Sequence, residues 1–141
     1  MWRDTIAGLD SAATLADPVT EEDLRRADER LGQPLPAARR SLLLETDGVT
    51  DKYGVGLIWE LDRIVADNLT FRRHPDFARL YMPFDPLLFF ADAGNGEQFA
   101  VLSPPLDRND VFAWNHEDDS RRWVAPDVET YLRWRDGRIV L

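Results

Sequence analysis

The side chains that could do chemistry are mainly carboxylates, and they are concentrated between residues 85 and 119. They are Asp85, Asp92, Glu97, Asp107, Asp110, Glu117, Asp118 and Asp119, and Arg108 is the single lysine or arginine among them. Clustered carboxylates attract positively charged surfaces and can imitate the sign and spacing of nucleic-acid phosphates. The alternative is a set of solvated turns, because Asp and Asn side chains bond readily to their own backbone.

We predict a partner-binding site from this acidic stretch, extended by one amide and two tryptophans. Asn95 lies in the loop between two apolar runs, where binding residues are often found. Trp59 and Trp114 could anchor a partner, although packing in the core is the simpler explanation for large rings. The predicted binding residues are Asp92, Asn95, Glu97, Asp107, Asp110, Trp114, Glu117, Asp118, Asp119 and Trp59.

The sequence offers little for catalysis or metal binding. His116 stands beside carboxylates but lacks the paired-histidine spacing of zinc sites, and the chain has no cysteine. Ser41 and Ser103 lack neighbours that would activate a nucleophile. Gly94-Asn95-Gly96 lacks the lysine of a phosphate-binding loop. We therefore predict no catalytic residue, no metal and no cofactor.

Composition limits the class of protein that the chain can form and the kinds of partner that it can bind. The 141 residues suit one domain, 1–141, because no linker-like stretch or repeat divides them. Acidic residues outnumber Lys and Arg by 26 to 17, and the net charge of -9 argues against nucleic acid and anionic membrane as partners. No apolar run reaches the ~20 residues of a membrane-spanning helix, so we expect a cytoplasmic protein.

Short apolar runs late in the chain predict a three-stranded antiparallel core. Two runs, 87–91 and 99–102, flank an Asn-Gly pair that supplies the positive φ angles of a hairpin turn. Val111–Trp114 is the third strand. The remaining predictions are a strand at 55–59, an irregular connection at 76–86, a polar loop at 115–122, and an edge strand or docked segment at 139–141.

Apolar spacing predicts five helices. They cover residues 2–9, 20–32, 36–46, 61–74 and 127–135. Thr20, followed by three acidic residues, resembles a capping box, and Gly32 stands where a C-terminal cap belongs.

Four segments, taken in order, resemble those of a known family. They are Glu29-Arg30-Leu31-Gly32 with Leu35-Pro36 and Asp47-Gly48-Val49, the hairpin 89–99, the strand 111–117, and Val124-Ala125-Pro126 before a helix. This order is similar to that of the SUKH superfamily, which includes a fungal cell-wall-synthesis regulator and many bacterial immunity proteins. The resemblance covers roughly residues 20–135. Ala37-Ala38 departs from the acidic-aromatic pair common in the family after Leu-Pro.

The resemblance implies a fold and a mode of action. It implies a single α+β domain with a central, mainly antiparallel sheet of about four to six strands, packed against N-terminal and C-terminal helices. It also implies a binding protein without catalysis or cofactor. Immunity members of the family bind and neutralise a cognate toxin domain, often a nuclease.

Three hypotheses for function follow, and the sequence leaves the oligomeric state open. We favour an immunity protein that masks the basic active surface of a cognate toxin with acidic loops. The second hypothesis is a regulatory or scaffold module in signalling or cell-wall synthesis. The third is a small hydrolase using Asp107 with Asp110, or Glu117 with Asp119, but carboxylates within one loop reveal nothing about the separation such chemistry requires.

Overall fold

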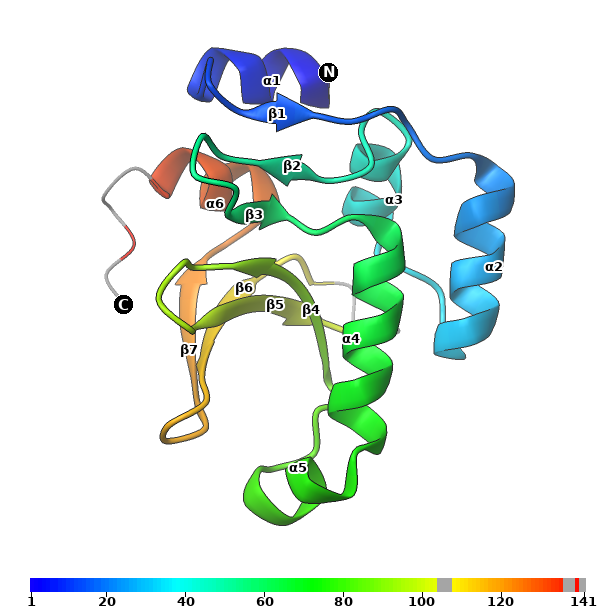
Figure 1. Cartoon of the computed structure of the whole chain (residues 1–141), viewed down its shortest axis with the longest axis vertical. Helices are drawn as coiled ribbons and strands as arrows, with labels where there is room; N and C mark the ends of the chain where they lie inside the picture. The colour runs from blue at the N-terminus through cyan, green and yellow to red at the C-terminus, as the bar shows by residue number, and fades with distance from the viewer. Residues whose placement is uncertain (104–107, 136–138, 140–141) are drawn as a thin grey trace.

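The computed structural model of the chain describes residues 1–103, 108–135 and 139. Within them the chain has an α+β fold with two antiparallel sheets (Figure 1). The helices are α1 (Trp2–Leu9), α2 (Glu21–Leu31), α3 (Ala37–Leu43), α4 (Leu61–Arg73), α5 (Pro75–Leu80) and α6 (Val128–Trp134). The strands are β1 (Thr14–Leu15), β2 (Val49–Thr50), β3 (Gly56–Ile58), β4 (Leu87–Asp92), β5 (Gln98–Leu102), β6 (Val111–Asn115) and β7 (Ser120–Ala125). Of the predicted segment 139–141, only Ile139 is described.

The larger sheet has the order β4-β5-β6-β7. The predicted three-stranded core is confirmed, with Leu88 opposite Val101 and Ala100 opposite Phe112. The predicted polar loop over 115–122 was wrong, because β7 follows after a short turn. Few side chains of this edge strand are buried, so its sequence lacks the apolar run that marked the other three.

The smaller sheet has the order β1-β2-β3 and was only partly predicted. The strands β1 and β2 have two residues each, too few to show an alternating pattern. The amide of Trp59 donates to the carbonyl of Phe90 at 2.7 Å and joins β3 to β4. The expected central sheet is therefore divided into two sheets, one of three strands and one of four, and this hydrogen bond links them.

The helix α5 replaces the first part of the predicted irregular connection. Pro75 begins this helix, where its missing N–H is no loss, because the first amides of a helix have no partner within it. His74 Nδ1 accepts a hydrogen bond from the amide of Asp76 at 3.2 Å. No side chain of α5 is buried, and the helix protrudes at the lower end of the molecule in Figure 1.

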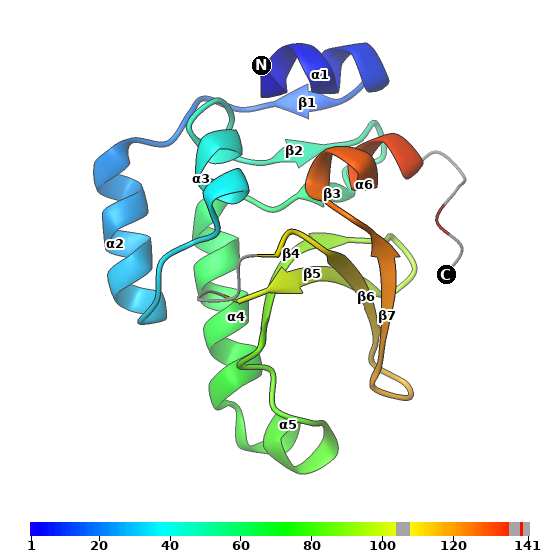
Figure 2. The same cartoon turned by 180° about the vertical axis from the view of Figure 1, so that it is seen from behind.

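Packing between α4 and β4 positions the larger sheet. α4 runs beside the sheet, with α2 on its outer side (Figures 1 and 2). Asn68 Nδ2 donates to the carbonyl of Phe89 at 2.9 Å, and its Oδ1 accepts from the amide of Phe89 at 2.8 Å. Leu24, Ile64 and Tyr131 share one apolar core with Phe89. No helix in the described ranges is long and apolar enough to cross a membrane.

Arg39 of α3 is an uncommon member of this core. Its side chain is 1% exposed, and its guanidinium lies 4.0 Å from the centre of the Phe90 ring. Among the described residues, Nε and Nη1 have no hydrogen-bond partner. Burial lowers the pKa of Arg39 to about 10, because the charged form loses its hydration. The ring contact offsets only part of that loss.

We predict that Arg39→Met leaves the free energy of unfolding unchanged or raises it by about 1–2 kcal/mol, because methionine fills the site without a buried charge. Arg39→Ala should lower it by about 2–4 kcal/mol, because it leaves a cavity over Phe90. Urea denaturation of the three proteins checks both values. If Met and Ala were equally destabilising, the guanidinium itself would be the stabilising group.

Candidate functional site

The β4–β5 turn and the β6–β7 turn project from the same end of the larger sheet. The register of β5 with β6 places the two turns beside each other, and Asn115 Nδ2 donates to Glu97 Oε1 at 3.0 Å between them. We call residues 92–97 and 115–119 the turn surface. It holds six of the predicted binding residues, namely Asp92, Asn95, Glu97, Glu117, Asp118 and Asp119.

Asp110 lies at the opposite end of β6. Its carboxylate accepts hydrogen bonds from Arg108 Nε at 2.9 Å and from Trp123 Nε1 at 2.8 Å. These two bonds, that from Arg108 foremost, lower the pKa of Asp110. Asp107 lies outside the described residues. The described carboxylates of the acidic stretch 85–119 are therefore not on one continuous surface, and Asp110 is already paired with Arg108 within the protein.

Asp92 is paired with α4. Its two carboxylate oxygens accept from Arg63 Nη1 at 2.7 Å and Nη2 at 3.0 Å, a two-point contact that neutralises its charge. The same guanidinium lies 4.0 Å from the centre of the Trp59 ring. Trp59 is 1% exposed, so it packs in the core and does not reach the surface where a partner would bind.

Asp119 joins three segments of the chain. Its carboxylate accepts from the amide of Met82 at 2.9 Å, from Trp114 Nε1 at 2.8 Å and from Arg121 Nη2 at 3.1 Å. Burial alone would raise the pKa of Asp119, but these hydrogen bonds outweigh it, and the pKa is lowered. Trp114 is 4% exposed, so it too packs in the core.

The segment after α5 is fixed against the β6–β7 turn. Tyr81 Oη donates to the carbonyl of His116 at 2.9 Å, and Arg121 donates to the carbonyls of Met82 and Pro83 at 2.7 and 2.9 Å. Tyr81 has an extended backbone, so its neighbours project to the other side. Leu80 and Met82 are consequently 69% and 67% exposed.

This exposed pair was missed by the sequence reasoning. Both residues lie in the segment 76–86, which the sequence predicted to be an irregular connection, and neither was predicted to bind a partner. The sequence signal that could have revealed them is the alternation of inward and outward side chains over residues 80–82. That alternation can be recognised only once Tyr81 is known to face His116.

Two carboxylates of the turn surface are exposed. They are Glu117 and Asp118. Asp118 Oδ1 accepts from the amide of Ser120 at 2.9 Å, and this backbone hydrogen bond lowers the pKa of Asp118. Asn95 is also exposed, and its Oδ1 accepts from the amide of Glu97 at 3.0 Å. All three side chains are exposed to a partner, and the charge of Arg122 also acts on Asp118.

In the described part of the chain, no group of three or more histidine, aspartate or glutamate side chains is placed to hold a metal ion. The polar groups of the turn surface bond instead to backbone amides, to arginines and to one another. What this arrangement offers is a firmly held acidic surface with two exposed apolar side chains beside it.

The fold and the order of its elements define a protein of the SUKH superfamily. More specifically, residues 18–134 match the SMI1/KNR4 family (SUKH-1), and the chain belongs to that family. The family includes toxin-immunity and regulatory members and is generally non-enzymatic. A comparison with curated proteins found no match.

We predict that Asp119→Asn lowers the free energy of unfolding at pH 7 by about 1–2 kcal/mol, because three donors lose a charged acceptor. Asparagine tolerates the left-handed backbone at this position, where φ is 58°. A lowered carboxyl pKa stabilises the folded state above the unfolded-state value of about 3.9, and that stability is lost as the pH falls through the folded-state value. The difference between the two proteins should therefore shrink below about pH 4.

Urea denaturation between pH 7 and pH 2.5 measures this difference. Asp17→Asn is the control, because Asp17 is exposed and should change stability by less than about 0.5 kcal/mol. A difference that stayed constant over the whole pH range would show that the charge of Asp119 does not stabilise the turn.

Proposed function

We propose that the chain is a non-enzymatic immunity protein, which neutralises a cognate bacterial toxin domain by covering its basic active surface. A nuclease is a suitable target, because its cleft must attract phosphates and is therefore positively charged. Membership of a family with toxin-immunity members supports this proposal. In this proposal the protein acts in the cytoplasm, where it meets the toxin before the toxin reaches its substrate.

One observation carries the proposal: two exposed carboxylates and two exposed apolar side chains lie on two segments that hydrogen bonds hold together. We call Leu80, Met82, Glu117 and Asp118 the tip. Hydrogen bonds from Tyr81 to the β6–β7 turn and from the amide of Met82 to Asp119 join the segment of Leu80 and Met82 to the turn of Glu117 and Asp118. In Figure 1, α5 and the β6–β7 turn both lie toward the lower end of the molecule.

Such a tip combines the properties that fast and stable binding needs. The carboxylates, together with a net charge of -9, steer the protein toward a basic partner. Apolar side chains that enter a recess on the partner slow dissociation. Because the tip is already fixed by hydrogen bonds, little conformational freedom is lost on binding.

The four other predicted binding residues of the turn surface divide into two roles under this proposal. Asn95 and Glu97 extend the contact surface onto the neighbouring turn. Asp92 and Asp119 position the turns through their arginine partners, and they contribute less charge to the encounter because that charge is neutralised.

A regulatory or scaffold module is the alternative, because the family also includes regulatory members. The same tip would then bind a host protein in signalling or cell-wall synthesis. Growth separates the two functions. Deleting the gene should harm cells only when toxin is present if the chain is an immunity protein, whereas a regulator should alter growth or morphology in every condition.

We predict that the double variant Glu117→Gln/Asp118→Asn associates about three- to tenfold more slowly with the cognate toxin domain, at low salt. The deficit should disappear at about 0.5 M salt, where exposed charges are screened. Leu80→Ser/Met82→Ser should instead accelerate dissociation, because it removes the apolar anchors. Surface plasmon resonance resolves the two rates, and co-expression with the toxin measures protection.

Asp17→Asn, which removes an exposed charge far from the tip in sequence, is the matched control and should bind like the parent protein. Unchanged association, dissociation and protection in both double variants would rule out the tip as the contact. Harm from gene deletion without any toxin would favour the regulatory alternative.

A further inference from the structure

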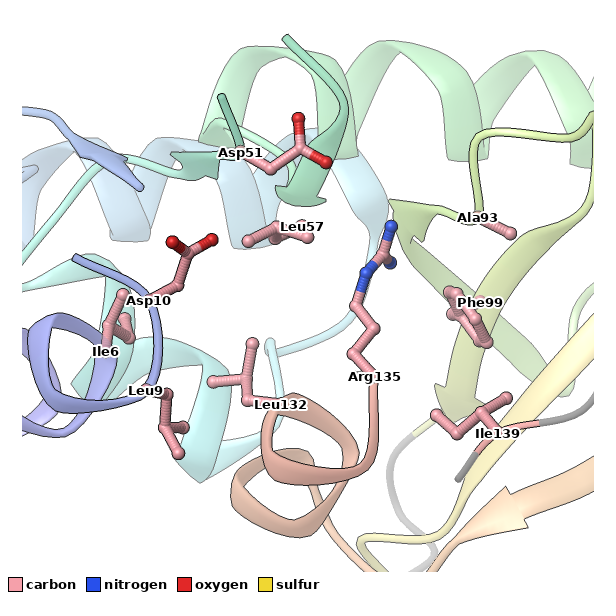
Figure 3. A pocket seen from close by; sticks show the side chains of 10 residues that line it. All are labelled: Ile6, Leu9, Asp10, Asp51, Leu57, Ala93, Phe99, Leu132, Arg135 and Ile139. Atoms are coloured by element: carbon pink, nitrogen blue, oxygen red, sulfur yellow. The ribbon is translucent and has the colours of Figure 1, made fainter. Parts of the chain in front are cut away.

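A pocket of about 250 Å³ lies between α1 and α6, and none of the residues of the tip lines it (Figure 3). The helices α1 and α6 form two of its walls, and the strands β3 and β5 form the others. Ala93 of the β4–β5 turn also lines it, so the pocket borders the turn surface. Its volume is below the ~300 Å³ at which pockets for drug-sized ligands begin, and it is suited to a single side chain.

The floor of the pocket is apolar. Ile6, Leu57 and Leu132 line it, and each is less than 10% exposed. In Figure 3 these side chains come from three elements, namely α1, β3 and α6, and surround the open space. An occupant therefore gains most if its body is a hydrocarbon chain that can lie against these groups.

Two carboxylates reach this pocket from different elements. Asp10 follows α1, and its Oδ1 accepts from the amide of Ala12 at 2.9 Å. Asp51 follows β2, and its Oδ1 accepts from the amides of Tyr53 and Val55 at 2.8 and 2.9 Å. Both side chains are thus held by one oxygen. Among the described residues nothing donates to the other oxygen, Oδ2, of either carboxylate.

Arg135 is the positively charged residue that lines the pocket, and its guanidinium is hydrogen-bonded within the protein. Its Nη1 donates to the carbonyl of Asp92 and to Tyr131 Oη, both at 2.6 Å. In Figure 3 its side chain rises between Leu57 and Phe99. The positive charge of Arg135 therefore repels a second cation, whereas the carboxylates of Asp10 and Asp51 attract it.

We propose that this pocket receives a lysine or arginine side chain of the protein partner. The aliphatic stem lies against Leu57 and Leu132, and the charged head lies between the carboxylates of Asp10 and Asp51. This inference rests on the proposed function in one respect only, namely that the partner is a protein, which supplies the lysine or arginine side chain. It uses none of the residues of the tip.

Titration of the ¹⁵N-labelled protein with Nα-acetyl-lysine amide, followed by NMR, tests the inference. Nα-acetyl-norleucine amide is the matched probe, because it keeps the stem and lacks the ammonium group. The lysine probe should shift the amide signals of Asp10, Asp51, Leu57 and Leu132 in a saturable way. We expect the norleucine probe to bind at least about fivefold more weakly, as the loss of one ion pair implies.

Asp10→Asn and Asp51→Asn should each weaken binding of the lysine probe about three- to fivefold. Asparagine keeps the Oδ1 acceptor for the backbone amides, so both variants should unfold at the same urea concentration as the parent protein. Asp17→Asn removes the same charge elsewhere and should leave probe binding unchanged.

Equal binding of the two probes would reduce the site to an apolar hollow and overturn the proposal. Unchanged lysine binding in both Asn variants, or shifts confined to other residues, would also overturn it. These outcomes are independent of the protection assay. A protein that binds the lysine probe but gives no protection keeps the pocket and loses the immunity function, and the reverse result loses only the pocket.

Discussion

The carboxylate of Asp119 is the contact on which the candidate site depends. It accepts hydrogen bonds from the segment after α5, from β6 and from β7, and Arg121 of β7 reinforces the contact by donating to the carbonyls of Met82 and Pro83. Its backbone has a φ of 58°, in the left-handed region, where Asp and Asn are among the few residues with a side chain that fit well. Asp119 therefore helps to fix the β6–β7 turn against the segment that carries Leu80 and Met82.

That contact illustrates a wider constraint on acidic surfaces. A partly buried carboxylate must find donors within its own protein, because an unpaired charge away from water is costly. Asp92, Asp110 and Asp119 meet this requirement with Arg63, Arg108 and Arg121. A count of acidic residues in the sequence therefore overstates the charge available to a partner. The charge that remains for contact lies on the exposed members of the turns.

The sequence predicted those parts of the fold that are set by neighbouring residues. The capping box at Thr20 and the left-handed Gly32 after α2 need only a few adjacent positions, and both were foreseen. The pairing of Arg108 with Asp110 is also local. In contrast, Arg63 meets Asp92 across 29 positions of chain, and no periodic pattern encodes that contact. The exposure of Met82 depends in the same way on the distant Arg121 and Asp119.

The size of a stable protein contact connects the tip with the pocket beside Arg135. A specific interface buries about 800 Å² on each partner, more than the four side chains of the tip can supply. The β4–β5 turn lies between the two regions, since Asn115 ties it to one and Ala93 lines the other. Asp92 holds that turn from both sides, with its carboxylate on Arg63 and its carbonyl on Arg135. A partner that covers the tip and continues across this turn therefore meets a rigid surface, and the next recess on its path is the pocket between α1 and α6.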